Sequence, residues 1–220
     1  MTTTLHFYPG NASLIPHILL RELGEPFELA LVDRNVNAQK SPEYLRLNPN
    51  GLIPVLVQGE QVLYETAAIA LHLADTHPQA GLMPPLGTPE RAQAYKWLMW
   101  LTNTVQATMI PYFYPDRFVD AGDADAAAQV KRQAQIKLGG CFDQLDALLA
   151  GHGGPWLLGE RYSLLDAYTL TMCRWSRGFS GPESAPARER PHLRPYLDRM
   201  LARPAVRAAF AAEGIQAPWF

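Results

Sequence analysis

A serine stands where the first predicted helix begins, in the stretch FYPGNASLIPHILL (7–20). Pro16 suits the first turn of that helix, because the N–H groups there lack intrahelical partners. Ser13 can act as an ordinary N-cap. Alternatively, its hydroxyl donates to an anion held at the positive end of the helix dipole. A thiol with an ordinary pKa of about 8.5 would ionise more readily there and become a nucleophile.

A second helix start combines an acid and a hydroxyl, in YETAAIALHL (64–73). Glu65 or Thr66 can cap the helix. The same position can also bind a ligand, because free N–H groups at a helix N-terminus attract a carboxylate. Glu65 beside them could hold an ammonium group. A ligand with both groups, such as an amino acid, would then be bound twice.

A proline interrupts the strand LIPVLVQ (52–58). Proline removes a donor from the hydrogen-bond ladder and is therefore unusual inside a sheet. Pro54 is either an ordinary edge-strand proline or part of a tight bend with a cis peptide bond. In the second case the N–H and C=O groups of Ile53 could pair with an extended peptide, as an added strand does.

Aromatic residues gather near the end of a later helix, in PYFYPDRF (111–118). Tyr112, Phe113 and Tyr114 lie close in sequence to Arg117. Such a cluster is either core or the wall of a pocket for an apolar substrate. Ser163 and Asp166 have the spacing of a capping box, and we interpret that pair as structural.

These residues must be positioned by two kinds of structure. Alternation and turn residues predict strands over 4–8, 26–32, 52–58 and 61–65, with helices over 14–24 and 66–77 and a short helix within 41–51. The first strand–helix–strand unit predicts a parallel pair of strands. A segment rich in Pro and Gly at 77–90 separates this half from a purely helical one. Helices are expected there over 90–118, 124–150, 163–177, 192–202 and 204–213.

Composition limits the class of protein. The 220 residues are 48% hydrophobic and 18% charged, with a formal net charge of −2, which predicts a folded chain and disfavours a nucleic-acid binder. The two cysteines, Cys141 and Cys173, have no zinc-type spacing, so neither a metal site nor a disulfide framework is expected. Without a secretory pattern or a long apolar run, we expect a cytoplasmic protein that does not enter membranes.

Four motifs together resemble one family. They are YPGNASLIPHILL, LNPNGLIPVL, ETAAIALHL and GERYSLLDAYTL, in this order along nearly the whole chain. The chain resembles a cytosolic glutathione transferase, most closely the bacterial, beta-like branch. The resemblance implies a fold that is α/β plus all-α: a thioredoxin-like glutathione-binding domain at 1–80, a linker at 81–89 and a helical-bundle domain at 90–220. It also implies a homodimer.

The resemblance assigns the ligand-binding residues as well. Glutathione would be a cosubstrate, with no metal required. Ile53, before the proline Pro54, would pair its backbone with the cysteinyl part of the tripeptide. Glu65 and Thr66 would bind its γ-glutamyl end, in agreement with the chemistry of that helix start. Two further residues lie where the family contacts the glycyl end or the backbone, namely Gln39 and Asn50.

The sequence departs from the beta-class pattern at two positions. Ala12 stands where the class commonly has a cysteine, so this side chain cannot form a mixed disulfide with glutathione. Gln106 stands where the class tends to have a histidine facing the substrate cavity. The position of the tyrosine used by other relatives holds Phe7, which leaves Ser13 and Asn11 as the residues expected to stabilise the thiolate.

We therefore expect a detoxifying enzyme that conjugates glutathione to small hydrophobic electrophiles. The electrophile would lie between the domains, against a wall formed by Tyr112, Phe113, Tyr114, Arg117 and Gln106. Glutathione-dependent disulfide reduction, dehalogenation or isomerisation would use the same thiolate and stays an alternative. A non-catalytic binding module on this fold is a further alternative.

Overall fold

The computed structural model describes residues 2–181 and 183–220, which divide into two units. The first unit contains the residues up to Met83 together with Leu201–Gln216. The second contains Pro84–Met200 and Ala217–Phe220. The first unit therefore takes in a helix from near the end of the chain.

The first unit is built on a four-stranded sheet with the order β2-β1-β3-β4. The strands are β1 (Thr3–Phe7), β2 (Glu28–Leu31), β3 (Val55–Gln58) and β4 (Gln61–Tyr64). Strands β1 and β2 are parallel, whereas β3 is antiparallel to both β1 and β4. The predicted strand–helix–strand unit and the hairpin are thus both confirmed.

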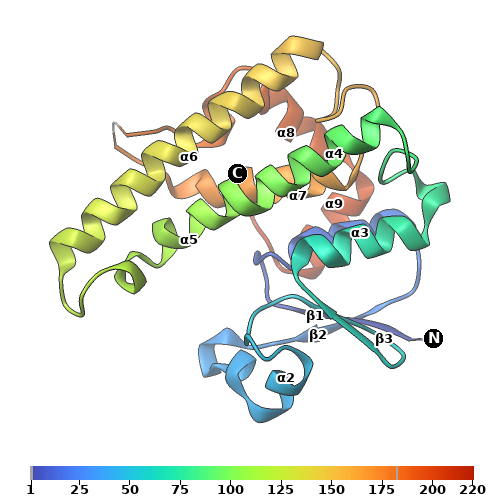
Figure 1. Ribbon diagram of the computed structural model, residues 1–220, viewed down its shortest axis with the longest axis horizontal. Helices are drawn as coiled ribbons and strands as arrows, with labels where there is room; N and C mark the ends of the chain where they lie inside the picture. The colour runs from blue at the N-terminus through green and yellow to red at the C-terminus, as the bar shows by residue number, and fades with distance from the viewer. Residues whose placement is uncertain (1, 182) are drawn as a thin grey trace. The chain divides into compact units, whose positions relative to one another are not determined.

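Helices cover both faces of this sheet. Helix α1 (Leu14–Leu23) connects β1 to β2, and it ends at Gly24, whose φ of 69° suits a residue without a side chain. Helix α3 (Thr66–Thr76) follows the hairpin and contacts α1 and β3. Helix α2 (Pro42–Leu47), with the short 3₁₀ turns η1 (Arg34–Val36) and η2 (Ala38–Lys40) before it, lies on the opposite side of the sheet from α3 (Figure 1).

Helix α9 (Pro204–Ala212) completes the first unit by packing on α1. Its buried face consists of Ala205, Val206, Ala209 and Phe210. These apolar positions recur at helical spacing, so one side of α9 leaves water when it packs. Apart from His17, the buried residues of α1 are apolar, which gives this contact a hydrophobic driving force.

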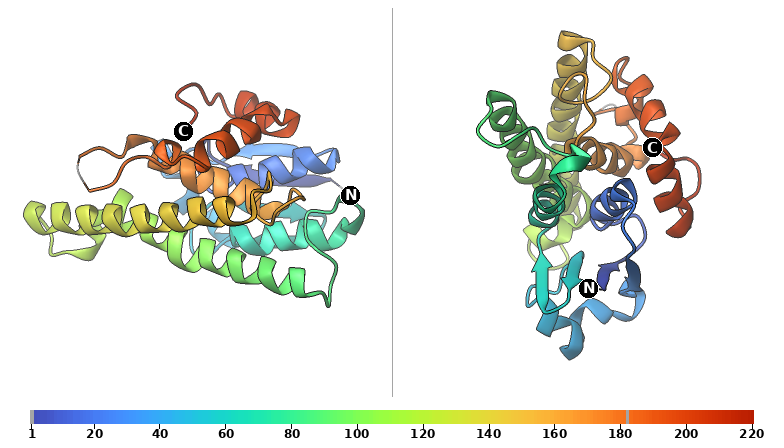
Figure 2. Two further views of the ribbon diagram at one scale, coloured as in Figure 1. Left: turned by 90° about the horizontal axis from the view of Figure 1, so that it is seen from above. Right: turned by 90° about the vertical axis from the view of Figure 1, so that its right-hand side faces the viewer.

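The second unit is helical. Its helices are α4 (Pro89–Trp100), α5 (Ala107–Phe113), α6 (Ala124–His152), α7 (Leu164–Trp175) and α8 (Leu193–Ala202), whose last residues belong to the first unit. Helix α6 runs alongside α5 (Figure 2). Helix α7 is buried from Leu164 to Arg174, so it is the central helix of this unit.

The prediction of one continuous helix over 90–118 is wrong. A π-helical turn, η4 (Leu101–Gln106), separates α4 from α5, and α5 ends at Phe113 before a 3₁₀ turn, η5 (Pro115–Phe118). Proline explains the end, because Pro115 cannot continue the helical hydrogen bonding and disfavours helical backbone at the residue before it. Nothing in the sequence pattern indicated the π turn.

The observed fold confirms the predicted class: a thioredoxin-like unit and a helical unit. Within the described ranges, none of the helices is both long enough and apolar enough to cross a membrane. Cys141 and Cys173 are both buried free thiols that form no disulfide bond.

Candidate active site

The loop between β1 and α1 carries the first predicted site residue, Ser13. Its side chain is 0% exposed and occupies the N-cap position of α1. The hydroxyl donates to the carbonyl of Tyr8 (3.2 Å) and accepts from the Tyr8 N–H (3.3 Å). Pro16 accounts for this direction, because the third helical residue, which an N-cap serine usually contacts, here has no N–H to offer. Ser13 therefore stiffens the loop.

The first amides of α1 already have partners. Leu14 N–H donates to the Asn11 carbonyl (3.0 Å) and Ile15 N–H to the Ala12 carbonyl (3.2 Å). Our expectation that unpaired amides would stand at this helix end thus does not hold for these two groups. A ligand anion here would depend on the helix dipole and on side chains.

Asn11 is the half-buried polar side chain of this loop. Its Oδ1 atom accepts a hydrogen bond from Nη1 of Arg34 (3.2 Å). The guanidinium carbon of Arg34 also lies 5.7 Å from the centre of the Tyr8 ring. The sequence analysis did not predict Arg34 as a site residue. The local pattern shows only that a basic residue follows the second predicted strand.

A buried contact between a histidine and a carboxyl group holds the other side of the loop. Glu213, just after α9, accepts from Gly10 N–H through Oε2 (2.8 Å), and its Oε1 lies 2.8 Å from Nδ1 of His17. Both side chains of the His17–Glu213 pair are 0% exposed. Because the two residues lie 196 positions apart in sequence, no local pattern could have connected them.

The N-terminus of helix α3 carries the expected acid and hydroxyl. Glu65 is the exposed N-cap residue of α3, and Thr66 is buried. Glu65 adopts φ 71° and ψ 115°, a left-handed backbone that residues with a side chain rarely adopt. Such strained residues concentrate at functional sites, so the geometry makes this helix start a ligand-site candidate.

The bend before β3 contains a cis Ile53–Pro54 peptide bond. Of the two interpretations of Pro54, the cis bend is therefore the one observed. The approach to this bend is held by two donors, since Tyr44 Oη (2.8 Å) and Asn48 Nδ2 (2.9 Å) both bond the Leu52 carbonyl. Burial raises the pKa of Tyr44, so its phenol stays a neutral donor near neutral pH.

The two residues expected at the glycyl end lie in neighbouring loops. Gln39 is in η2, and its Oε1 atom is buried without a hydrogen-bond partner among the residues that the structure describes. Asn50 is exposed, and its carbonyl accepts from Nζ of Lys40 (3.1 Å). A side chain at Gly51 (φ 61°) would meet Lys40 Nζ at 2.6 Å and the Gln39 carbonyl at 2.8 Å, which explains the glycine. Lys40 was not predicted, and it adds a positive charge beside Asn50.

The aromatic residues predicted for the electrophile lie together in the second unit. The ring of Tyr112 is 5.0 Å from that of Phe113, and Phe113 is 6.5 Å from Tyr114. Tyr112 is buried, and burial raises its pKa, whereas Phe113 is 45% exposed. Arg117 lies over the Tyr114 ring at 4.1 Å. Lys131 Nζ also lies 5.2 Å from the centre of the Tyr112 ring, so the cluster offers an apolar surface with cations at its edge.

Gln106, the fifth of these residues, is held differently. It ends the π turn η4, and its Oε1 atom accepts a hydrogen bond from the buried Tyr168 hydroxyl. A groove of about 570 Å³ lies between α5 and α6 and is lined by Asn103, Thr108 and Lys137 among others. Its lining includes none of the predicted aromatic residues, and sequence reasoning did not foresee it.

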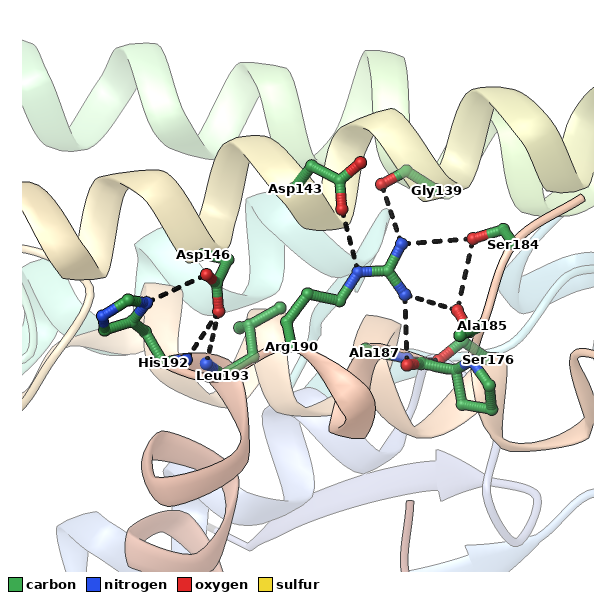
Figure 3. Close-up of polar contacts among 11 residues, drawn as sticks. Gly139, Asp143, Asp146, Ser176, Ser184, Ala185, Ala187, Arg190, His192 and Leu193 are labelled. Atoms are coloured by element: carbon green, nitrogen blue, oxygen red, sulfur yellow. Dashed lines mark hydrogen bonds and ion pairs between the residues drawn. The ribbon is translucent and has the colours of Figure 1, made fainter.

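Arg190 forms the centre of a polar cluster in the second unit (Figure 3). Nε contacts Asp143 (3.0 Å), Nη2 contacts the Gly139 carbonyl and Ser184 Oγ (both 3.2 Å), and Nη1 contacts the carbonyls of Ala185 and Pro186. All five donors of the guanidinium are therefore used. The cluster fastens the chain before α8 to α6 and is structural.

The start of α7 confirms the structural interpretation of Ser163 and Asp166. The two residues form a capping box, and Asp166 is fully buried. Burial raises the pKa of Asp166 to about 6, although hydrogen bonds from Leu157, Ser163 and Tyr196 oppose the rise. Across 2–181 and 183–220, no three His, Cys, Asp or Glu side chains form a group that could hold a metal ion.

Comparison with known families identifies both halves of the chain. Residues 12–76 match the family of the glutathione S-transferase N-terminal domain. Residues 126–199 match the family of the glutathione S-transferase C-terminal domain. The curated glutathione S-transferase GST-4.5 of Xanthomonas campestris is 35% identical over 216 residues, which cover 96% of this chain and 98% of that protein.

Solved structures agree with these matches. A glutathione transferase homologue from Sulfitobacter, with bound glutathione, has a TM-score of 0.84 at 28% identity and covers 98% of this chain and 99% of its own. The bacterial beta class glutathione S-transferase of Sphingomonas chungbukensis has a TM-score of 0.80 at 31% identity, with coverage of 97% and 100%. The similarity therefore spans both units of the fold.

Proposed function

Because the chain belongs to the bacterial glutathione S-transferase family, and so is a glutathione-dependent transferase, we propose that it ionises the thiol of glutathione beside Asn11. One observation carries this assignment. Of the two residues predicted to stabilise the thiolate, Ser13 is buried and gives its single hydroxyl proton to Tyr8. Asn11 is half-buried and has an amide nitrogen with two donors.

The chemistry needs no protein nucleophile. The thiol proton passes to solvent, and the remaining thiolate is stabilised by the Asn11 amide and by the positive end of the α1 dipole. Its sulfur lone pair forms a bond to an electrophilic carbon. The leaving group departs with the bonding electrons, or a double bond takes them up when the reaction is an addition. Glutathione is consumed as a cosubstrate.

The remaining residues of the first unit bind the tripeptide. Glu65, with its exposed carboxylate, and Thr66 take the ammonium and carboxylate of the γ-glutamyl end. The Ile53 backbone, before Pro54, pairs with the cysteinyl part. The glycyl end lies near Gln39 and Asn50. The Gln39 oxygen, which has no partner among the described residues, suits a peptide N–H of the ligand and not its carboxylate.

Residues of the second unit hold the electrophile. The surface formed by Tyr112, Phe113 and Tyr114 suits a small hydrophobic compound, and Arg117 at its edge suits a partial negative charge. Gln106 contributes an amide in place of the histidine of beta-class relatives.

The same proposal covers the domains and the setting of the reaction. Residues 1–80 bind glutathione, 81–89 form the linker and 90–220 hold the electrophile. The enzyme acts as a homodimer in detoxification, and it acts in the cytoplasm. Its two buried cysteines without a disulfide are compatible with a reducing compartment.

The deciding experiment compares Asn11→Ala with Ser13→Ala. Thiolate absorbance of bound glutathione is titrated against pH, and conjugation of a small aromatic electrophile is measured. Removing Asn11 should lower kcat/KM by about a hundredfold, because loss of one donor to a catalytic anion typically costs about 10²–10³ in rate. It should also move the thiol pKa toward about 8.5. Ser13→Ala should leave the thiol pKa unchanged.

Asn35→Ala is the matched control, because this exposed asparagine lies in the nearby turn η1. It should behave like the unmodified protein. Suppose that the pKa of the bound thiol in Asn11→Ala equals that in the unmodified protein, while the pKa in Ser13→Ala is raised. Ser13 would then be the residue that stabilises the thiolate. Retention on glutathione-agarose without any conjugation would favour the binding module.

A further inference from the structure

We propose that Arg34 is a positioning residue for the transferase reaction: it orients the Asn11 amide so that the nitrogen, and not the oxygen, faces the glutathione sulfur. The proposal rests on the proposed function of Asn11. The evidence for this role of Arg34 is its position beside the loop before α1 and the hydrogen bond that it donates to Asn11.

The sheet register brings Arg34 to this loop. Strands β1 and β2 are parallel, with Phe7 opposite Leu31. One further hydrogen bond extends the pairing of the two strands: Val32 N–H donates to the Phe7 carbonyl (2.8 Å). Parallel strands end at the same edge of a sheet, so the residues after β2 meet the residues after β1.

A local cap then fixes the position of Arg34. Asp33 Oδ1 accepts from Asn35 N–H (2.9 Å) and starts the turn η1 directly after the second strand. Arg34 is the first residue of that turn and is half-buried. Its guanidinium reaches Asn11 Oδ1 at 3.2 Å and lies over the Tyr8 ring at 5.7 Å.

The chemistry of the two groups determines the amide orientation. A guanidinium has only donors, whereas an amide has an acceptor oxygen on one branch and a donor NH₂ on the other. The branch of Asn11 that faces Arg34 must therefore be the oxygen. The NH₂ branch points elsewhere, and a thiolate can accept from it. Without the cation, either branch could face the sulfur, and the oxygen would repel it.

Several other donors of this loop are already engaged. The Ser13 hydroxyl donates to Tyr8, and the amides of Leu14 and Ile15 donate to the preceding turn. Two carboxylates belong to the same neighbourhood of the fold. Asp33 caps η1, and Glu213 is bonded to Gly10 and His17. The Asn11 amide and the positive charge of Arg34 are both suited to a negative sulfur.

The test is Arg34→Met, which keeps an unbranched stem and removes both the charge and the donors. We expect the pKa of the bound thiol to rise by about one unit, which is a tenfold loss of thiolate. kcat/KM should then fall about tenfold at about pH 6.5 and approach the unmodified value once the pH exceeds the raised pKa. The glutathione dissociation constant, measured calorimetrically, should change less than about threefold.

Two variants serve as controls for this result. Arg46→Met removes the same charge from an exposed site on α2, where the side chain is 73% exposed, and should change neither quantity. Arg34→Lys keeps a charge and a donor and should restore most of the thiol acidity. If Arg34→Met fails to fold, an unchanged thiol pKa in a folded Arg34→Leu, which also lacks every donor, would overturn the proposal just as well.

A double-mutant cycle tests whether Arg34 acts through Asn11. In an Asn11→Ala background, Arg34→Met should lower kcat/KM by less than about twofold. Additive losses would mean that Arg34 acts on the sulfur directly and would overturn the proposal. So would weaker glutathione binding with an unchanged thiol pKa, which would place Arg34 on a carboxylate of the tripeptide.

The failure of the proposed function gives a different result. In that case the unmodified protein would not bind glutathione, or would bind it with a thiol pKa of about 8.5, as in water. If the unmodified protein binds and ionises glutathione while Arg34→Met does so equally well, only the role of Arg34 is wrong.

Discussion

Two helices of this protein begin with nearly the same residues and start in different ways. Helix α1 is preceded by Ser13 and continues Leu-Ile-Pro, whereas α7 is preceded by Ser163 and continues Leu-Leu-Asp. Both serines are buried, at 0% and 2% exposure. The fourth residue of each stretch, Pro16 or Asp166, makes the difference.

At α7 the acid closes the helix start. Asp166 Oδ2 accepts from Ser163 N–H (2.7 Å), while Oδ1 accepts from Leu157 N–H (2.8 Å) and the Tyr196 hydroxyl (3.0 Å). The carboxylate thereby joins three segments of the second unit. Such a network contributes to stability and leaves little opportunity for a ligand.

At α1 the proline changes the role of the serine. Pro16 has neither an N–H nor an acid, so Ser13 bonds Tyr8 and shapes the preceding loop. Asn11 in that loop can then meet a ligand near the positive helix end. The comparison shows that one substitution at the third helical position separates a structural cap from a candidate site.

The largest expected effect on stability is at the N-terminus of α7, where Asp166 completes the cap. Asp166→Ala leaves the N–H groups of Leu157 and Ser163 without their acceptor, and the Tyr196 hydroxyl keeps only the longer contact with the carbonyl of residue 166 (3.4 Å). Because each buried unpaired group costs about 1–3 kcal/mol, the free energy of unfolding should fall by about 2–6 kcal/mol. Urea denaturation measures this loss. Asp198→Ala is the control, since that side chain is 53% exposed, and a loss equal to the control would refute the comparison.

The same carboxyl gives the stability a pH dependence. Burial raises the pKa of Asp166 from 3.8 to about 6, so the folded protein holds this proton more tightly than the unfolded chain does. Its contribution is complete below about pH 4 and is lost as the pH rises through about 6, with a magnitude of up to about 3 kcal/mol.

Unfolding at several pH values tests this sign. Between about pH 4 and 7 the stability of the unmodified protein should decline relative to that of Asp166→Asn, which cannot titrate. The exposed Asp198→Asn should follow the unmodified protein. A relative increase over this range would show that the hydrogen bonds outweigh the burial.

A smaller effect on stability is expected at the N-terminus of α1, where Ser13 contacts the Tyr8 backbone. Ser13→Ala removes both contacts with the Tyr8 backbone and should lower the free energy of unfolding by about 1–2 kcal/mol. Ser163→Ala should cost less, about 0.5–1 kcal/mol, since Asp166 still accepts from the backbone N–H of residue 163. Thermal or urea unfolding of the two variants compares them. The reverse order would mean that the Ser13 hydroxyl contributes little to the loop.

The smallest effect should come from Pro16→Ala. Position 16 then has an N–H that Ser13 can cap, and the unfolded chain gains freedom, so the stability should change by less than about 1 kcal/mol. The informative measurement is hydrogen exchange of the Tyr8 amide, which should become faster as the serine turns away. Unchanged exchange would show that the proline is not what directs Ser13 toward Tyr8.

Local sequence patterns predicted most elements of the fold. The strands and most helix ends follow from alternation, capping residues and turn residues, as at Gly24. The acid and hydroxyl at Glu65 and Thr66 were recognisable because a helix start has a local signature. The π turn over 101–106 had no such signature and was missed.

The sequence by itself determined which residues begin and end helices, which segments form strands and which family motifs are present. These are properties of neighbouring residues, and neighbours interact in any compact arrangement of the chain. Tertiary structure alone decided the direction of the Ser13 hydroxyl, the contact of Arg34 with Asn11 and the pairing of His17 with Glu213. Those contacts depend on strand register and helix packing, which bring polar atoms together across 23 or 196 positions of the chain.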